Sequence, residues 1–390
     1  MTDNSAPGEF PALVGRFERW LMDQALPLWA DKGLDRAHGG FFDLVNLNGQ
    51  SVAGPKRGRV QGRQSWVFAL AGTMGWRGPW RDIARQGLDF ALSRRRKDSQ
   101  IPTLIATDGS VLDETATLYD QTFFLLALSE AIKHFPERHD LREAAHLIYR
   151  ATVTTRRNPA GGFAESAEQV FQSNPHMHLL EATLAWREVE PGGIWDTLAD
   201  EVVELGTTRL MDKNGAIREF YDADWNPVPG APGRSVEPGH QFEWAWLLLR
   251  SAAHHTIPVR DVALRLIAIG ENVGVHNGVA VNALLDDFTV TNGGARLWPQ
   301  TERLKAALRA ASVTGNPNYW SIAQAAAASL RRYLDTPIRG LWFDERKSDG
   351  TLIDSPVPAS TFYHLVGAIA ELDVALRNAN PEESTRQWNT

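Results

Sequence analysis

The stretch Asp120–Lys133, DQTFFLLALSEAIK, is apolar on nearly every side of the helix that its periodicity predicts. After a short connection, Arg138–Arg150, RHDLREAAHLIYR, has the periodicity of a helix with one polar face. A helix that is apolar all round is buried on most sides, whereas one with a polar face lies at a surface. The two segments therefore predict a helical hairpin with one inner and one outer member.

The same alternation recurs along the chain and predicts twelve helices in six pairs. They are expected at 10–31, 61–77, 80–94, 117–134, 138–156, 176–189, 193–209, 240–254, 258–272, 299–313, 318–334 and 360–378. Connections within pairs are short. Those between pairs carry glycine, apolar or aromatic residues and a turn signal, as in Gly39–Asp43 followed by Leu47–Gly49, which is typical of a β-hairpin.

Helix pairs that repeat at intervals of roughly 45 to 80 residues form either an open solenoid or a closed ring. The inner helices are too apolar to line a wide groove filled with solvent, so closure is favoured. The fold class predicted is all-α, an (α/α)6 barrel with short β-hairpins in the loops that join the helix pairs. No segment rich in Ser or Pro divides the chain, so one domain is expected over residues 1–390.

Composition narrows the function classes. The net charge is −7 and no basic run exceeds Arg94–Lys97, so no nucleic-acid partner is expected. The N-terminal MTDNSAPGEF lacks the features of a signal peptide, and no apolar run approaches the length of a membrane span. The chain has no cysteine, which excludes disulfides and thiolate metal sites and fits a cytoplasmic location. The sequence leaves a homodimer open.

The segment Ser235–Arg250, SVEPGHQFEWAWLLLR, is the strongest indication of chemistry. His240 and Glu243 stand one helical turn apart among aromatic and aliphatic residues. Imidazole titrates near neutral pH, so a histidine beside a carboxylate is suited to proton transfer at pH 7. This pair is interpreted as half of an acid–base site.

Polar and aromatic residues follow all six long linkers, at the starts of the expected inner helices. These starts contain Arg63, Tyr119, Asn174 with His176 and His178, His240 with Glu243, Trp298 with Gln300 and Glu302, and His364. In a ring of parallel inner helices these starts converge at one mouth, where free backbone N–H groups favour hydroxyl-rich or anionic ligands.

Each residue also has a structural interpretation. Arg63 could be an ion-pair partner, and Tyr119 a packed ring beside the helix cap. Asn174, followed by Pro175, has the features of a helix cap whatever else it does. His176 and His178 point to different sides of a helix, so at most one is expected to face the centre.

Other site types are less well supported. His-x-x-Glu and His-x-His spacings can bind metal, but neither HExxH nor the facial carboxylate pattern is present, so no metal is expected. The glycine-rich loops that cradle phosphates are also absent from the sequence, so no cofactor is expected. A glycosidase would need two inward carboxylates, with Glu181, Glu243 and Glu302 available, but hydrolysis leaves the histidines unexplained.

Four segments resemble the N-acylglucosamine 2-epimerase family, which also holds cellobiose 2-epimerases and aldose–ketose isomerases that act on mannose. They are NPHMHLLEA (174–182), EPGHQFEWAWLL (237–248), RLWPQTERLKA (296–306) and FYHL (362–365). The resemblance spans nearly the whole chain and implies an (α/α)6 barrel. It implies catalytic roles for His240 and His364, with the carboxylate of Glu243. It implies sugar binding by Arg63, Tyr119, His176 or His178, Trp298, Gln300 and Glu302.

The resemblance, together with the single tryptophan in LWPQTE, favours the mannose isomerase branch. The predicted function is cofactor-free conversion of a free hexose, D-mannose to D-fructose, through a cis-enediolate. His364 takes the C2 proton, and His240, oriented by Glu243, moves protons between O1 and O2. A sugar 2-epimerase acting on mannose or glucose, cellobiose or an N-acylglucosamine is the alternative. A non-catalytic carbohydrate-binding barrel is a third interpretation.

Overall fold

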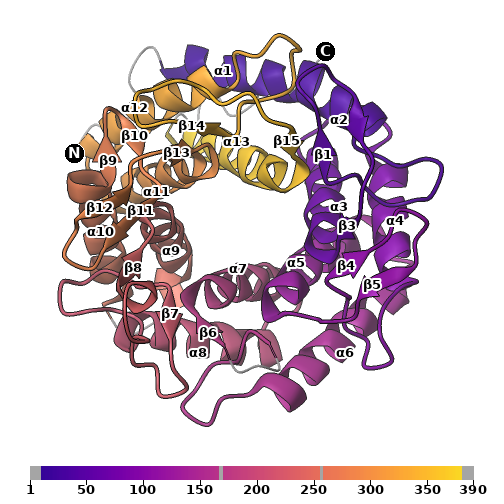
Figure 1. Ribbon diagram of the computed structural model, residues 1–390, viewed down its shortest axis with the longest axis horizontal. Coiled ribbons are helices and arrows are strands. Elements are labelled where there is room, and N and C mark those ends of the chain that lie inside the picture. Colours follow the sequence, from indigo (N-terminus) through magenta and orange to yellow (C-terminus); the bar gives the residue numbers. More distant parts are fainter. Residues whose placement is uncertain (1–9, 167–169, 255–257, 380–390) are drawn as a thin grey trace.

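Helices in the structure form two concentric rings (Figure 1). The structure is a computed structural model that describes residues 10–166, 170–254 and 258–379. The remaining residues, including most of the N-terminal segment considered above and part of the expected 1–390 domain, lie outside the described ranges. Within the described residues, no helix is both long and apolar enough to cross a membrane.

Six helices form the inner ring. They are α3 (Gly58–Thr73), α5 (Leu118–His134), α7 (Ser173–Val189), α9 (Pro238–Ser251), α11 (Trp298–Thr314) and α13 (Ala359–Ala379). Each contacts the next, and α13 contacts α3, so the ring is closed. Most of their residues are buried on all sides, as the apolar stretches predicted.

The outer ring is amphipathic. It contains α1 (Phe10–Trp20) with α2 (Leu26–Lys32), α4 (Trp80–Leu92), α6 (His139–Arg156), α8 (Ile194–Thr208), α10 (Val259–Ile269) and α12 (Asn318–Tyr333). The predicted (α/α)6 barrel is thus confirmed. The first predicted helix is interrupted by a π-helical turn at Leu21–Ala25, immediately before Pro27, which has no backbone N–H to continue the ladder. Short 3-10 and π turns at Pro232–Arg234, Ala252–His254 and Gly270–Gly274 complete the helical segments.

Short strands occupy the linkers. They are β1 (Leu44–Val45), β2 (Ser51–Val52), β3 (Lys56–Arg57), β4 (Leu104–Ile105), β5 (Val111–Asp113), β6 (Phe171–Gln172), β7 (Phe220–Tyr221), β8 (Ser235–Val236), β9 (Val275–His276), β10 (Val279–Ala280), β11 (Ala283–Leu285), β12 (Val290–Asn292), β13 (Ala295–Arg296), β14 (Glu345–Arg346) and β15 (Val357–Pro358). The hairpins predicted at β1–β2 and β4–β5 are present. The β9–β10 hairpin was not predicted, and the expected strand at Gly161–Phe163 is reduced to one bridge between Arg157 and Phe163.

Strands that precede inner helices pair with strands of neighbouring linkers. Thus β3 pairs with β4, β6 with β7, β8 with β11 and β13 with β14, while β15 pairs with β1. Because one strand of each pair leads directly into an inner helix, the ladders hold these helix starts at one end of the barrel. The pairing of β15 with β1 joins the last linker of the described chain to the first.

Five inner helices also bind a linker through a side chain near the first turn of the helix, which forms hydrogen bonds with the backbone of that linker. Gln61, Gln121, Gln241 and Gln300 each accept a hydrogen bond from one linker residue's N–H and donate to the same residue's carbonyl, the partners being Phe41, Ile101, Ile217 and Ala280. On α7, His176 accepts from the N–H of Phe163 through Nε2. These side chains satisfy buried backbone groups that would otherwise lack partners.

This arrangement predicts a stability effect for Gln300. Replacing Gln300 with Leu should lower the free energy of unfolding by about 2–4 kcal/mol, since the N–H and carbonyl of Ala280 lose their partners in a buried setting. The measurement is urea denaturation followed by circular dichroism. Gln86, exposed on α4, provides the control, and an equal loss in Gln86→Leu would contradict the prediction.

Candidate active site

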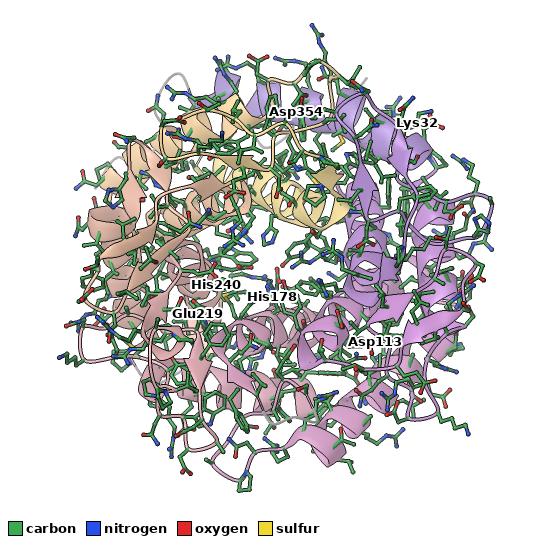
Figure 2. All side chains as sticks on the ribbon, viewed as in Figure 1. Lys32, Asp113, His178, Glu219, His240 and Asp354 are labelled. Carbon is green, nitrogen blue, oxygen red and sulfur yellow. The ribbon has the colours of Figure 1, made fainter. Side chains whose placement is uncertain are left out.

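A cavity of about 340 Å³ opens where the starts of the six inner helices meet. Its lining includes Arg57, Arg59, Arg63, Tyr119, Asn174, His178, Glu237, His240, Glu243, Arg296, Trp298, Asp344, Pro358, Ser360, Thr361 and His364. Every inner helix contributes at least one of these residues, as the sequence predicted for a ring of parallel helices. In Figure 2, His178 and His240 lie at the inner ring, whereas Lys32 lies at the periphery.

His240 is held by Glu219, which comes from the linker just before β7. Nδ1 of His240 lies 2.9 Å from Oε2 of Glu219, and both side chains are buried. Burial lowers the pKa of His240, but the carboxylates of Glu219 and Glu237 outweigh burial and raise this pKa to about 9. At neutral pH the ring of His240 is therefore an imidazolium, an acid that faces the cavity.

His364 has the opposite electrostatic setting. Its Nδ1 lies 2.8 Å from Oε1 of Glu302, and Oε2 of Glu302 forms an ion pair of 2.7 Å with Lys305. Burial and the positive charges of Arg63 and Lys305 lower the pKa of His364 well below its usual value. At neutral pH this imidazole is uncharged, with Nδ1 bound to Glu302 and Nε2 left to act as a base.

Trp298 contacts both imidazoles. Its ring centroid lies 5.0 Å from that of His240 and 5.5 Å from that of His364, with tilted geometry in each case. One half-buried indole thus packs against the acid and the base and fixes their orientation relative to the cavity.

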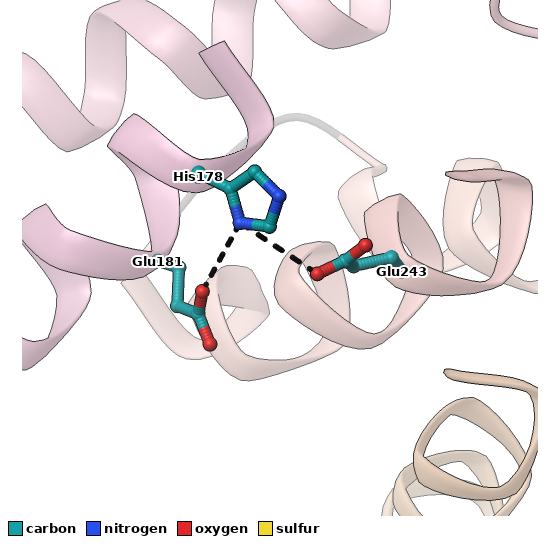
Figure 3. A group of neighbouring side chains, drawn as sticks. All are labelled: His178, Glu181 and Glu243. Atoms are coloured by element: carbon teal, nitrogen blue, oxygen red, sulfur yellow. Dashed lines mark hydrogen bonds and ion pairs between the residues drawn. The ribbon is translucent and has the colours of Figure 1, made fainter. Parts of the chain in front are cut away.

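His178, which lines the cavity, lies between two carboxylates (Figure 3). Nδ1 of His178 is 3.3 Å from Oε2 of Glu181 and 3.7 Å from Oε1 of Glu243. Burial lowers the pKa of His178 to about 4, so this ring is neutral. Glu181 also accepts a hydrogen bond from the hydroxyl of Tyr363.

Glu243 lines the cavity and differs from Glu181. Neither of its oxygens has a hydrogen-bond partner within the described chain, and burial together with the charge of Glu302 raises its pKa well above the usual value. A neutral carboxyl group can both donate and accept a hydrogen bond. Glu243 is therefore equipped to bind a ligand hydroxyl in the cavity.

Arg63 and Tyr119 form the opposite wall. Nη2 of Arg63 donates to the hydroxyl of Tyr119 at 2.9 Å, and Nη1 donates to the carbonyl of Ser360 at 3.1 Å. The guanidinium also stacks on the ring of Phe123, 3.9 Å from its centroid. Asn174 lines the cavity with a buried Oδ1 that has no partner within the described chain. These contacts fix the position of Arg63, and no ion pair joins it to a carboxylate among the residues that the structure describes.

Comparison with known proteins places the chain in a family. Residues 40–368 match the family described as N-acylglucosamine 2-epimerase (GlcNAc 2-epimerase). The chain belongs to the N-acylglucosamine 2-epimerase family.

Similar proteins in this comparison carry isomerase and epimerase names. The mannose-6-phosphate isomerase of Rhizobium meliloti is 44% identical, over 93% of this chain and 97% of that protein. The N-acylglucosamine 2-epimerase of Rattus norvegicus is 26% identical, over 84% of this chain and 83% of that protein. A crystal structure of a D-mannose isomerase has the same fold, with a TM-score of 0.83 at 19% identity, over 94% of this chain and 99% of that chain. The chain is accordingly an isomerase-class enzyme.

The geometry corrects the predicted partner of His240 and decides between His176 and His178, of which at most one was expected to face the centre. His240 is oriented by Glu219 and not by Glu243, although Glu243 follows it by one helical turn. His176 lies away from the cavity, because Nδ1 is bound by the carbonyl of Gln172 and Nε2 by the N–H of Phe163. His178 is the histidine of this pair that lines the cavity.

Gln300 and Glu302 also do not line the cavity. Gln300 is fully engaged with backbone groups of Ala280 and Arg296, and so holds a linker where sugar binding was predicted. Glu302 is buried behind His364 and orients that ring. Gln300 is two residues from Trp298 and therefore points to the other side of α11, whereas Glu302 lies one turn further along on the side of Trp298 and is fully buried.

The residue that sequence reasoning missed is Glu219. It follows Arg218 in a linker that also contains Asp212, Asp222 and Asp224, so its sequence context gives no signal that sets it apart from the other acids. Arg296, Glu237 and Asp344 line the cavity and were also not among the predicted site residues.

Three groups of side chains within the described residues have the spacing to hold a cation. Their ligand atoms lie within 4.8 Å of one another, and the groups are His178–Glu181–Glu243, Glu219–Glu237–His240 and Glu243–Glu302–His364. Most of these carboxylates already face a histidine, a tyrosine hydroxyl or a lysine. Metal-independent catalysis stays a prediction.

Proposed function

We propose that this enzyme is a cofactor-free aldose–ketose isomerase that converts D-mannose to D-fructose. Sugar isomerase or epimerase is the activity class that the relatives support. The single observation that carries the proposed proton-transfer chemistry is the pair of histidines with opposite protonation on one cavity. The carboxylates of Glu219 and Glu237 raise the pKa of His240 to about 9, whereas the pKa of His364 is lowered well below its usual value.

The reaction uses one acid and one base. With the sugar in its open form, Nε2 of His364 takes the proton from C2, and the C–H electron pair forms the C1=C2 bond. The carbonyl oxygen O1 becomes an enediolate oxygen and receives a proton from His240. Neutral His240 then takes the proton from the O2 hydroxyl, the C2=O2 bond forms, and His364 returns its proton to C1. All protons are thereby accounted for.

The groups around the two histidines serve the enediolate. The cationic guanidinium of Arg63 and the free N–H groups at the helix starts stabilise negative charge on its oxygens. His178 and Glu243 are placed to bind further hydroxyl groups, and Trp298 supports the ring faces of both histidines. Tyr119 and Asn174 complete the proposed binding set.

A 2-epimerase is the second candidate function because family members carry that name. Epimerisation requires C2 to be reprotonated from the face opposite to the one that lost its proton. A protonated His240 can deliver that proton only if it lies across the enediol plane from His364. The unequal pKa values provide one base and one acid, which both reactions need. The relative with 44% identity carries an isomerase name, and this favours isomerisation.

The relative with 44% identity is named mannose-6-phosphate isomerase, so a phosphorylated substrate has to be compared with an uncharged one. Among the arginines that line the cavity in the described chain, three are already paired with carboxylates. The pairs are Arg57–Asp43, Arg59–Asp120 and Arg296–Glu237. Since a phosphate would compete with these carboxylates, the charge distribution supports an uncharged hexose.

Incubation with D-mannose in D2O, followed by NMR, tests the proposal. We expect D-fructose as the product. D-glucose with deuterium at C2 would identify an epimerase, and no conversion with retained binding would identify a carbohydrate-binding protein. Parallel assays on D-mannose 6-phosphate decide the charge of the substrate, and a higher kcat/KM for the phosphate would contradict the assignment to a free hexose.

A further inference from the structure

One lysine is buried beneath the cavity among carboxylates. Lys305 is 1% exposed and follows Glu302 by one turn of α11. Its Nζ lies 2.7 Å from Oε2 of Glu302 and 3.5 Å from the ring centroid of Trp246. A fully buried lysine is rare in proteins and costly unless its charge is paired. Lys305 does not line the cavity, so it acts through a neighbour and not on a ligand.

That neighbour is Glu302, whose two oxygens have different partners. Oε2 faces the ammonium of Lys305, and Oε1 faces Nδ1 of His364 at 2.8 Å. An ionised Glu302 can only accept a hydrogen bond, so the proton of the neutral imidazole must reside on Nδ1. Nε2 then carries the lone pair. A protonated Glu302 could instead donate to Nδ1, which would place the ring proton on Nε2 and remove the base.

Of the charged groups around this pair, some raise the pKa of Glu302 and others lower it. Burial raises the pKa of Glu302, and among the surrounding groups Lys305 opposes this rise most strongly. The other titratable or charged groups that face the Glu302–His364 pair from the neighbouring helices are Arg63, His178, Glu181, Glu243 and Tyr363. Of the two cations Lys305 and Arg63 near this pair, Lys305 is the one that forms an ion pair with Glu302.

We propose that Lys305 is a positioning residue whose ammonium keeps Glu302 ionised and thereby holds His364 with Nε2 free to accept a proton. The proposal rests on the proposed function in that Nε2 is the base of the isomerisation. It assigns a chain of three residues, Lys305 and Glu302 on α11 and His364 on α13, that connects a fully buried lysine with the cavity.

The pH profile of kcat/KM for Lys305→Met tests the catalytic consequence. Removing the cation raises the proton affinity of the Glu302–His364 pair, so the pair retains an extra proton up to a higher pH. The acid limb should move upward by about one to three pH units. On the acid side of the new limb, kcat/KM should fall by about 10-fold for each pH unit and recover above it, with KM nearly unchanged. Lys305→Arg should retain much of the activity.

Lys133→Met is the matched control. Lys133 pairs with Glu130 at 2.9 Å with the same (i, i+3) spacing, but it lies in the last turn of α5, away from the cavity. Its pH profile should coincide with that of the unchanged enzyme. If Lys305→Met gives the same acid limb as Lys133→Met, the proposal is wrong.

A second measurement needs neither a substrate nor a folded variant at position 305. In the unchanged protein labelled with 15N-histidine, the ring signals of His364, assigned by their loss in His364→Asn, should show the proton on Nδ1 between pH 7 and 8. A proton on Nε2 would overturn the proposal. Because no sugar is present, this result stands even if D-mannose proves not to be the substrate.

Discussion

Replacing His364 with Asn should reduce kcat by about 10²- to 10⁴-fold, the usual contribution of a positioned base. The amide of Asn can still donate a hydrogen bond to Glu302, so the buried carboxylate keeps a partner. What is lost is Nε2, the nitrogen that takes the C2 proton in the proposed reaction. KM should change little, because Arg63, Tyr119 and Glu243 still line the cavity. The measurement is steady-state turnover of D-mannose.

The control for this variant is another His–Glu pair. His146 on α6 lies 3.1 Å from Glu190, outside the cavity, so His146→Asn should leave kcat unchanged. Turnover by His364→Asn within about tenfold of the unchanged enzyme would exclude His364 as the base and shift attention to the neutral ring of His178.

Much of the fold could be predicted because helical periodicity is a local property. The range 318–334 was predicted and Asn318–Tyr333 is helical, and the range 117–134 corresponds to Leu118–His134. The convergence of the six helix starts followed from topology alone, since parallel inner helices in a closed ring must begin at one end. No contact between distant residues had to be known for either step.

The partners of the site residues could not be predicted in this way. His240 has two acidic neighbours in sequence, Glu237 and Glu243, yet its hydrogen-bond partner is Glu219, which precedes it by 21 residues in the long linker between α8 and α9. A backbone hydrogen bond from the N–H of Glu219 to the carbonyl of Ser235 brings Glu219 to the start of α9, and such a contact within an irregular linker leaves almost no signal in the sequence. Gln300 was misassigned for a related reason, because its partner Ala280 lies in the unpredicted β9–β10 hairpin.

Glu219 carries the second prediction. Glu219→Gln should lower kcat/KM at pH 8 by about 10- to 100-fold, because the acid His240 loses its main counter-charge. In the unchanged enzyme the basic limb of kcat/KM should fall near pH 9, where His240 loses its proton. Without the carboxylate of Glu219, burial lowers the pKa of His240, and the basic limb should move down by about one to three pH units. Near pH 6 the two enzymes should differ least.

Stability should report the same ion pair. The pKa of His240 in the folded protein, about 9, lies above its ordinary value, so the pair stabilises the fold fully below about pH 6.5 and this contribution is lost as the pH rises through 9. Glu219→Gln should abolish that pH dependence of the free energy of unfolding.

Glu190→Gln, which removes the partner of His146, provides the control for the kinetic prediction and should leave the basic limb of kcat/KM near pH 9. A basic limb that stays near pH 9 in Glu219→Gln would mean that another carboxylate keeps His240 charged, with Glu237 the nearest alternative.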